Sequence, residues 1–225
     1  MIRLEAVGRA YGVGAARLKA LEGVSLGVDA GEFVAVAGPS GSGKTTLLNL
    51  MAGIDAPTSG RVLFEGRDLA GLRAADLATL RLRRVGLVFQ QFNLIPVLTA
   101  EENVLFPLLF RSDLGAQERR RAARTALERV GLSGVCGRRP AQMSGGEQQR
   151  VAVARALAGT PSLVLADEPT ANLDHETGGA VIRLMRELNR ERGTTFLYAT
   201  HDPELVRLAD RVVTLRDGSV AEASG

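Results

Sequence analysis

The chain has 225 residues, of which 45% are hydrophobic and 24% charged, a composition that is ordinary for one large globular domain. Its formal charge is only +3, which is weak evidence for nucleic-acid binding, and no nucleic-acid partner is expected. A single cysteine, Cys136, excludes an intrachain disulfide and any metal site built from cysteines. The longest apolar run, residues 104–110, is too short to span a membrane, and the N-terminus does not resemble a signal peptide.

The N-terminal part of the chain alternates predicted strands with helices. Ile2 and Leu4 alternate with charged residues, which is typical of an edge strand. Further along, the patterns predict helices at 45–51 and 68–80 and strands at 24–28, 32–37, 61–64 and 85–89. The first strands have an antiparallel character, so the sheet is predicted to be mixed.

Strand signals disappear between residues 90 and 159, where three helices are predicted, at 99–109, 117–130 and 144–158. Thr99 is the expected cap of the first helix, with two glutamates in its first turn. Arginines cluster at 81–84 and 119–124. We interpret these clusters first as solvated helix faces and second as a sign of proximity to an anionic membrane.

The last part of the chain returns to alternating elements. The patterns predict a helix at 176–192 between strands at 162–166 and 194–200, and then a hairpin across Asp217-Gly218. We therefore predict a single α/β domain over 1–225, and the pattern G-x-x-x-x-G-K-[ST] at 38–45 predicts that its core is that of a P-loop NTPase. Its sheet is mixed and mainly parallel, with an N-terminal antiparallel β part. Residues 1–89 and 160–225 form the core, and residues 90–159 form an inserted, mostly helical subdomain.

A glycine-rich segment between the strand at 32–37 and the helix at 45–51 matches the phosphate-binding pattern G-x-x-x-x-G-K-[ST]. Glycines let the backbone curl so that successive N–H groups point at phosphate oxygens, and the helix adds the positive end of its dipole. Lys44 can reach the β- and γ-phosphates, and the Thr45 hydroxyl can ligate Mg²⁺. The expected phosphate-binding residues are Gly38, Ser40, Gly41, Ser42, Gly43, Lys44, Thr45 and Thr46.

Two adjacent carboxylates, Asp167 and Glu168, follow the predicted buried strand at 162–166. The carboxyl ends of strands are where ligands bind in open α/β sheets. Asp167 can hold Mg²⁺, and Glu168 can orient and polarise an attacking water. An acidic pair after an apolar run is a weak signal alone, but downstream of a P-loop it becomes a strong one.

A second glycine-containing helix start lies at Ser144-Gly145-Gly146-Glu147. The N-terminus of a helix is suited to an anion. The same residues also read as an ordinary capping box, in which Ser144 and Glu147 satisfy each other's backbone. The two interpretations are compatible, and the pattern alone does not separate them.

With this segment the chain comes to resemble the ABC-family ATPases. Met143-Ser144-Gly145-Gly146-Glu147-Gln148 is similar to the signature motif of that family. The family's order is also followed by Tyr11, the P-loop, Gln90, the signature, Asp167-Glu168, Ala171-Asn172-Leu173-Asp174 and His201. The resemblance covers essentially the whole chain. Met143 stands where leucine is usual and Glu147 where glutamine is common, and neither change removes a phosphate ligand.

The segments at 89–96 and 102–104 resemble one subgroup of the family. That subgroup contains lipoprotein-releasing, macrolide-exporting and peptide-exporting ATPases and a cell-division relative. Two functions stay open. The chain could power export or release of lipoproteins, peptides or drugs, or it could serve a membrane signalling complex that transports nothing. DNA-repair and chromosome-structure relatives are disfavoured, because they place a long coiled coil or large domains between P-loop and signature.

The resemblance implies a role for each aligned residue in binding and hydrolysing ATP with Mg²⁺. Tyr11 would stack on adenine, and Gln90 would contact Mg²⁺ and the attacking water. His201 would contact the γ-phosphate, and Lys44 and Glu168 complete the expected catalytic group. On the residues alone, a half-buried tyrosine, a solvated glutamine and a surface histidine remain open alternatives.

The resemblance also implies partners. In the family, the signature of one subunit closes over ATP bound to the P-loop of another. Ser144, Gly145 and Gly146 would therefore act on a second copy of the chain, and Asp174 would lie at the dimer seam. Separate integral membrane permease subunits would hold the chain peripherally at the cytoplasmic face of the inner membrane. Five apolar residues of the segment 89–98 are expected to receive a cytoplasmic helix of that permease: Phe92, Leu94, Ile95, Val97 and Leu98.

Overall fold

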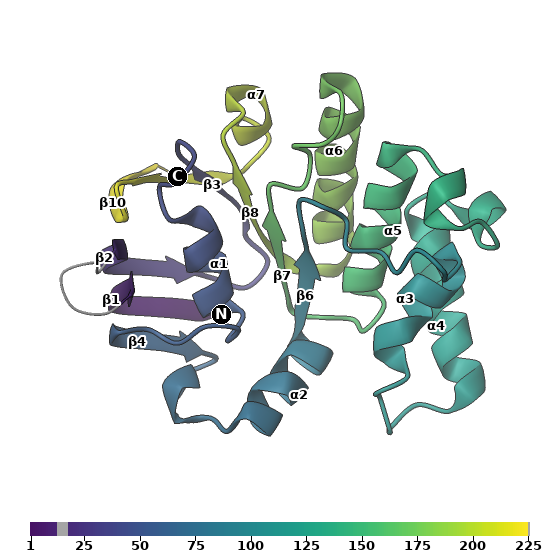
Figure 1. The fold of residues 1–225 in the computed structure, drawn as a ribbon, viewed down its shortest axis with the longest axis horizontal. Coiled ribbons are helices and arrows are strands. Elements are labelled where there is room, and N and C mark those ends of the chain that lie inside the picture. Colours follow the sequence, from purple (N-terminus) through teal and green to yellow (C-terminus); the bar gives the residue numbers. More distant parts are fainter. Residues whose placement is uncertain (13–17, 225) are drawn as a thin grey trace.

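The computed structural model describes residues 1–12 and 18–224, which form two sheets with helices around them (Figure 1). The larger sheet has six strands in the order β10-β9-β3-β8-β7-β6, parallel except for β10. Its strands are β3 (Phe33–Ala37), β6 (Val85–Val88), β7 (Leu163–Asp167), β8 (Thr195–Thr200), β9 (Arg211–Arg216) and β10 (Ser219–Ser224). The predicted mixed, mainly parallel sheet is confirmed.

The N-terminal antiparallel part is also confirmed, but it forms a second sheet of its own. Its order is β2-β1-β4-β5, and the bounds are β1 (Ile2–Tyr11), β2 (Leu18–Val28), β4 (Ser59–Phe64) and β5 (Arg67–Asp68). The prediction that the first strand lies at an edge is wrong, because β1 pairs with both β2 and β4. Alternation reports one buried face, and an inner strand of a half-exposed sheet shows the same alternation.

The helices of the described chain cover both faces of the larger sheet. They are α1 (Lys44–Met51), α2 (Ala74–Arg84), α3 (Ala100–Leu108), α4 (Ala116–Arg129), α5 (Gly145–Leu157), α6 (His175–Arg192) and the short α7 (Pro203–Val206). Helices α3, α4 and α5 gather at one side of the molecule, away from α1 (Figure 1). This grouping agrees with a mostly helical segment, and its limits at residues 90 and 159 remain a prediction.

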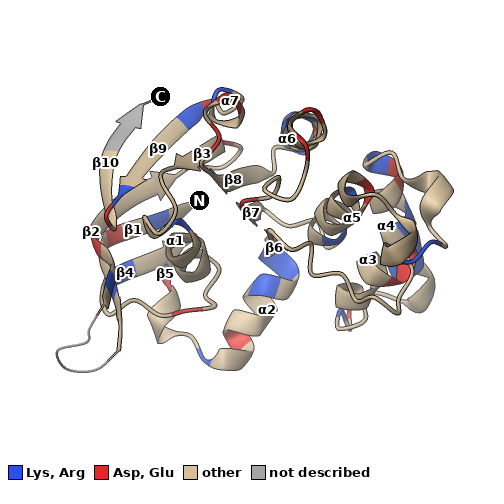
Figure 2. Cartoon of the chain, turned by 45° about the horizontal axis from the view of Figure 1, so that its top comes forward, with Lys and Arg blue, Asp and Glu red and all other residues tan. Residues whose placement is uncertain are grey.

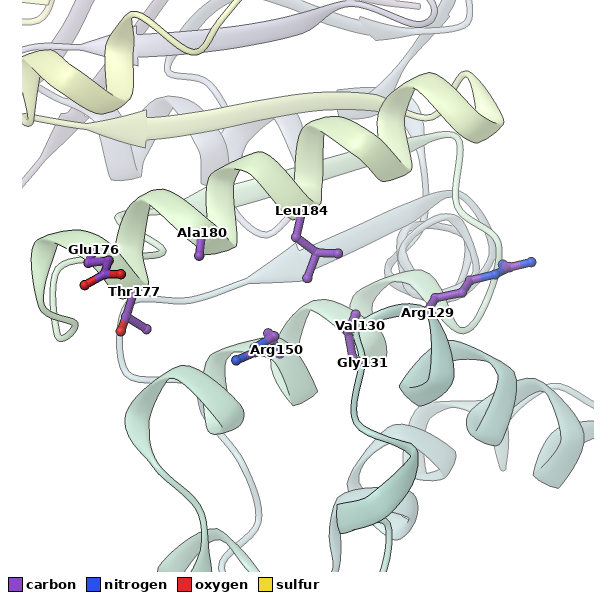
Figure 3. A pocket seen from close by; sticks show the side chains of 8 residues that line it. All are labelled: Arg129, Val130, Gly131, Arg150, Glu176, Thr177, Ala180 and Leu184. Atoms are coloured by element: carbon purple, nitrogen blue, oxygen red, sulfur yellow. The ribbon is translucent and has the colours of Figure 1, made fainter.

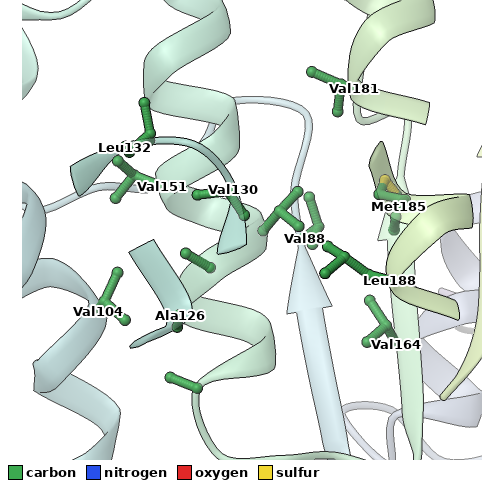
Figure 4. Close-up of a cluster of buried hydrophobic side chains, with 14 of the residues drawn as sticks. Val88, Val104, Ala126, Val130, Leu132, Val151, Val164, Val181, Met185 and Leu188 are labelled. Atoms are coloured by element: carbon green, nitrogen blue, oxygen red, sulfur yellow. The ribbon is translucent and has the colours of Figure 1, made fainter. Parts of the chain in front are cut away.

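Side-chain alternation along the parallel strands divides the core into two clusters. Val34 and Val36 of β3 pack with α1 and the antiparallel sheet. Phe33 and Ala35, which point to the opposite face, pack with α6 and with α3, α4 and α5. Figure 4 shows this second cluster, in which Val88 and Val164 of the sheet lie among side chains from α3, α4, α5 and α6. The helical segment therefore shares its apolar core with one face of the sheet.

Two of the predicted helix starts are confirmed by capping boxes. Thr99 accepts a hydrogen bond from the Glu102 backbone while Glu102 bonds back to Thr99. Ser144 and Glu147 do the same at the start of α5. The helix predicted at 68–80 is placed wrongly, because Leu69–Gly71 is a 3₁₀ turn capped by Asp68, and α2 begins only at Ala74.

The arginine clusters lie on α2 and α4 (Figure 2), and three of their seven arginines pair with carboxylates. Arg83 pairs with Asp113 at 3.1 Å, and Arg124 pairs with Glu101 at 3.0 Å. Arg84 pairs with Glu65. These ion pairs support the interpretation of the clusters as solvated helix faces. Within the described ranges, no helix is both long and apolar enough to cross a membrane.

Asn103 fixes the shape of the loop that leads from β6 into α3. Its side chain is 1% exposed, and its amide donates to the carbonyls of Ile95, Leu98 and Thr99 at 3.2, 3.1 and 2.9 Å. Its carbonyl oxygen accepts from the Ile95 amide at 2.7 Å. A single buried side chain thus bonds to four backbone groups. The Ile95 and Thr99 carbonyls also accept from the amides of Leu98 and Asn103, whereas the Ile95 N–H and the Leu98 carbonyl depend on this side chain.

We predict that Asn103→Leu lowers the free energy of unfolding by about 1–3 kcal/mol, because it leaves the Ile95 N–H and the Leu98 carbonyl without a hydrogen-bond partner. Urea denaturation followed by circular dichroism measures the change. Glu128→Gln, on the exposed face of α4, is the control and should shift stability by less than about 0.5 kcal/mol. An Asn103→Leu variant as stable as this control would contradict the prediction.

Candidate active site

An open cleft of about 460 Å³ lies at the carboxyl ends of β3, β7 and β8. The parallel strands end at one edge, so residues far apart in sequence meet there. The cleft brings together Tyr11, Ser40, Gly41, Gly43, Lys44, Thr45, Thr46, Gln90, Glu168 and His201 from the predicted set. Three further predicted residues adjoin the cleft in the chain but do not line its surface: Gly38, Ser42 and Asp167. The other four lie away from the cleft: Ser144, Gly145, Gly146 and Asp174.

The P-loop is curled because its glycines adopt backbone conformations closed to other residues. Gly38 and Gly43 have φ values of 156° and 103°. A Cβ at Gly38 would come within 2.3 Å of the Leu215 carbonyl oxygen, and one at Gly43 within 2.6 Å of the Ala20 carbonyl oxygen. The loop therefore packs backbone against backbone, and only glycine fits at these two positions.

The Lys44 side chain is only 6% exposed, and its ammonium group is surrounded by oxygen atoms. It donates to the carbonyls of Gly38 and Pro39 at 2.8 and 3.0 Å and lies 3.3 Å from Glu168 Oε1. A buried ammonium needs such compensation. Phosphate oxygens offer the same kind of compensation. An incoming phosphate can therefore replace some of the oxygen atoms that now surround the Lys44 ammonium group.

Glu168 lies between Lys44 and His201. Its second carboxylate oxygen is 3.0 Å from His201 Nδ1, and its side chain is 15% exposed. The Glu168 backbone has φ 45°, in the left-handed region that is costly for a residue with a Cβ. Its N–H donates to the Ala199 carbonyl at 3.1 Å, which holds this conformation against β8. The neighbouring strand thus aims the carboxylate into the cleft.

Asp167, the last residue of β7, has a buried Oδ1 atom that has no hydrogen-bond partner within the described chain. Burial raises the pKa of this carboxyl above its ordinary value, and Glu168 adds to the increase, whereas a hydrogen bond with Thr45 and the charge of Lys44 oppose it. An unsatisfied carboxylate oxygen beside a threonine hydroxyl is a donor set that suits a hard cation. These residues therefore fit Mg²⁺.

Tyr11 is held at the rim of the cleft by two residues that the sequence analysis did not identify. Its hydroxyl donates to Asp55 at 2.8 Å, and the Arg9 guanidinium lies 4.5 Å from the centre of its ring. Arg9 also pairs with Asp55 at 2.7 Å. The ring is 37% exposed, so an aromatic surface remains accessible in a fixed orientation.

Gln90 follows β6 and is linked to the segment that follows β7. Its carbonyl accepts a hydrogen bond from the Asn172 side chain at 2.8 Å. Asn172 belongs to the Ala171-Asn172-Leu173-Asp174 segment noted in the sequence, but the predicted site set did not include it. A contact between residues so far apart in sequence leaves no local pattern from which to identify it.

The second predicted anion site lies outside the cleft. Ser144 is the exposed N-cap of α5, where it accepts from the Glu147 amide at 3.2 Å. Asp174 is the N-cap of α6, where it accepts from the Thr177 amide at 2.9 Å. His175, which follows Asp174, is 61% exposed and pairs with Glu204 at 2.6 Å. The chain thus carries the P-loop cleft and a separate glycine-containing helix start, as the sequence predicts.

The sheet carries a curled glycine loop and a buried lysine after the inner strand β3, and an acidic pair at the end of β7, two strands away. This arrangement defines a P-loop nucleoside triphosphatase. Similarity to known proteins identifies the family within the P-loop nucleoside triphosphatases. Residues 21–171 match the family described as ABC transporter. The chain belongs to the ABC transporter family and is an ATP-hydrolysing domain of that family.

Relatives and solved structures match essentially the whole chain. It is 48% identical over 219 residues to the lipoprotein-releasing system ATP-binding protein LolD of Anaeromyxobacter dehalogenans, covering 97% of this chain and 92% of that protein. It is 45% identical over 226 residues to the macrolide export ATP-binding/permease protein MacB of Syntrophobacter fumaroxidans. That match covers 100% of this chain but only 32% of MacB, so the chain spans about a third of that relative's length.

Among solved structures, one similar to this chain is a dimer of the ATP-binding cassette MJ0796 of Methanocaldococcus jannaschii in a post-hydrolysis state, bound to ADP and phosphate. The TM-score is 0.91 and the sequence identity 43%, with 100% of this chain and 98% of that chain covered. The fold predicted from the sequence, a P-loop core with helical insertion, is confirmed by this likeness.

We predict that Asp167→Asn raises the free energy of unfolding at pH 7. The folded-state pKa of Asp167 is raised, so ionisation favours the unfolded chain, and the resulting loss of stability is complete above the folded pKa. As the pH falls toward the unfolded value, the wild-type carboxyl becomes protonated in both states and the gain should shrink. Paired urea titrations of wild type and variant across acid to neutral pH measure this difference. A variant that is less stable than wild type at pH 7 would refute the raised folded-state pKa of Asp167.

Proposed function

We propose that this chain hydrolyses ATP while paired with a second copy of itself and drives a separate membrane permease that exports or releases lipoproteins, peptides or drugs. The observation that carries this proposal is the convergence of Lys44, Glu168 and His201 with an unsatisfied Asp167 oxygen at one edge of the sheet. The named relatives LolD and MacB are a lipoprotein-releasing and a macrolide-exporting protein.

ATP binds in the cleft through its phosphates and its base. The curled P-loop directs backbone N–H groups at the phosphate oxygens, and Lys44 exchanges its carbonyl and Glu168 partners for the β- and γ-phosphates. The adenine stacks on the ring of Tyr11, which Arg9 and Asp55 hold in place. Binding therefore uses groups that are already oriented in the structure.

The expected Mg²⁺ ion would be held by Thr45, Asp167 and Gln90. When bound, it neutralises charge on the phosphate oxygens. The buried Asp167 Oδ1 atom has no hydrogen-bond partner among the described residues, and a bound cation would compensate its charge. Gln90 reaches the same region from the helical side of the cleft, and its backbone is tied to Asn172.

Hydrolysis depends on the Glu168 carboxylate. Once Lys44 turns to the phosphates, Glu168 accepts a hydrogen bond from a water molecule, orients it toward the γ-phosphorus and takes its proton. The water oxygen bonds to phosphorus and the bond between the γ-phosphorus and the β–γ bridging oxygen breaks, which yields ADP and phosphate. His201, 3.0 Å from Glu168, stands on the other side of the carboxylate and reaches the γ-phosphate.

The signature residues act on the ATP of the partner copy. Ser144, Gly145 and Gly146 begin helix α5 and do not line the cleft of their own chain. A helix N-terminus with exposed Ser144 is suited to the γ-phosphate presented by the other copy. The dimeric structures of MJ0796 support this arrangement. Asp174 then lies near the seam between the two copies.

The permease docks in an apolar groove between α2, α3 and α5. The groove has a volume of about 540 Å³, and its apolar lining includes Leu82, Phe89, Phe106 and Phe110. Phe106 and Phe110 are 42% and 66% exposed, and their rings meet edge to face with centroids 5.7 Å apart. Exposed aromatic pairs of this kind suit an amphipathic helix of a partner. The permease would hold the chain peripherally at the cytoplasmic face of the inner membrane.

The structure limits the part of this surface that the segment at 89–98 can supply. Phe92, Leu94, Ile95 and Leu98 are half-buried, and only Val97 of the five apolar residues expected to face the partner is exposed. The Phe92 ring lies 3.9 Å from the Cβ position of Gly145. A substitution at Phe92 would therefore disturb the signature as well as docking, and Phe110 is the better probe.

We predict that Glu168→Gln slows ATP hydrolysis by at least about a hundredfold, because the amide cannot take the proton of the attacking water. The variant should accumulate as an ATP-bound dimer, which size-exclusion chromatography with light scattering detects. Lys44→Ala, which loses phosphate binding, is the control and should stay monomeric with ATP. A Glu168→Gln protein that remains monomeric with ATP and Mg²⁺ at high protein concentration would overturn the paired arrangement.

We predict that Phe110→Asp leaves the basal ATPase rate and the fold unchanged but weakens permease binding at least about thirtyfold, since it removes an exposed aromatic anchor and adds a charge. The tagged chain is used to recover multi-span proteins from gently solubilised membranes of the native host, and binding of the purified partner is then titrated. Leu109→Asp, an equally charged change at an exposed residue outside the groove lining, is the control. Equal binding by both variants would exclude the groove as the docking site.

A further inference from the structure

Gly146 is a glycine for a reason that its backbone conformation does not explain. It lies inside α5 and does not have a positive φ, so alanine would fit the backbone and would favour the helix by about 1 kcal/mol. The obstacle is Thr177 of α6. A Cβ at Gly146 would come within 2.5 Å of Thr177 Cγ2, well inside van der Waals contact. Residue 146 must therefore be glycine because the Thr177 methyl of the same chain occupies the space that a Cβ would need.

Thr177 cannot move easily out of this contact. Its backbone N–H donates to the Asp174 carboxylate at 2.9 Å, at the cap of α6. Hydrogen bonds from this amide and then from the Thr177 hydroxyl lower the pKa of Asp174. A β-branched side chain in a helix has few accessible χ1 rotamers, so the Thr177 methyl cannot readily turn away from Gly146.

The same turn of α6 also packs on the segment that carries the catalytic carboxylate. A Cβ at Gly178 would lie 3.2 Å from Thr170 Cβ, and Thr170 is buried two residues beyond Glu168. A continuous path of close contacts therefore runs from the Glu168 segment through the first turn of α6 to the start of α5.

Beyond this contact, α5 and α6 separate around a cavity of about 420 Å³ (Figure 3). Arg150 of α5 and Ala180 and Leu184 of α6 line it, and Thr177 stands at one end. Where the cavity opens, α5 and α6 are not packed against each other. The contact between Gly146 and Thr177 therefore supports the N-terminal end of α5 from the side of α6, alongside Leu173 and Phe92, which approach Gly145.

We propose that Thr177 is a positioning residue, whose methyl group sets the place of the signature residues on the core and so aligns them with the ATP of the partner copy. The proposal rests on the action of Ser144, Gly145 and Gly146 across the dimer proposed above. Thr177 itself touches no nucleotide in this arrangement. It acts only through Gly146 and Asp174.

Four variants test this proposal: Gly146→Ala, Thr177→Ser, and Gly146→Ala combined with Thr177→Ser or with Thr177→Val. Serine keeps the hydroxyl and removes only the methyl, whereas valine keeps the methyl and the branched shape. Gly146→Ala should lower kcat at least about tenfold. Adding Thr177→Ser should restore kcat to within about threefold of Thr177→Ser alone, whereas adding Thr177→Val should restore nothing.

Two further measurements separate positioning from general damage. The Kd of the monomer for a fluorescent ATP analogue should stay within about twofold in every variant, because the P-loop cleft is untouched. ATP-dependent dimer formation, measured with each variant in the Glu168→Gln background, should follow the same loss and rescue as kcat. A rescue by valine equal to that by serine, or no rescue by serine, would overturn the role of the methyl. If Glu168→Gln alone fails to dimerise, the paired arrangement itself fails, and the two failures are thus distinguishable.

Discussion

The Lys44 ammonium group is the charge on which the arrangement of the site depends. It is almost fully buried, so it must be surrounded by oxygen atoms. The carbonyls of Gly38 and Pro39 supply two of them only because the loop curls back over the lysine, and the loop curls only because glycine occupies its crowded positions. Glu168 supplies the third from the end of β7, two strands away. One buried cation thus ties the loop conformation to the sheet edge.

The two clusters of the core divide the work of the molecule. One cluster joins α1 and the antiparallel sheet to one face of the parallel strands, and so holds the phosphate loop and the rim that carries Tyr11. The other joins α3, α4, α5 and α6 to the opposite face. Successive residues of β3 alternate between the clusters, so a single strand five residues long positions both halves. The functional cleft opens at the carboxyl edge of these strands.

Local patterns predicted most of the elements, since they are determined by neighbours in sequence. The capping boxes at Thr99 and Ser144 follow from a hydroxyl three residues before a glutamate, and the P-loop follows from its spacing. The first strand was placed at an edge because hydrophobic alternation records burial and not the number of neighbouring strands. The start of α2 was misplaced because a capped 3₁₀ turn has the same local signals as a helix start.

The residues that the sequence did not reveal act through long-range contacts. Asp55 and Arg9 hold Tyr11, Asn172 bonds to the carbonyl of Gln90, and Thr177 meets Gly146. Each pair joins segments whose proximity is set by the fold as a whole. Nothing in the spacing of the residues distinguishes such an asparagine or threonine from one on a solvated surface. The chemistry of single positions was therefore predictable, and the supports behind them were not.

Arg155 connects α5 to the loop that follows β6. From α5 it donates to the carbonyls of Phe92 and Asn93, and burial lowers the pKa of its guanidinium. Both carbonyl residues have positive φ, so the loop is fastened to the helix in a tightly bent form. Loop and helix are therefore joined into one unit. Because Asn93 and Arg155 both line the apolar groove, a partner bound there would press on the loop and on α5 together.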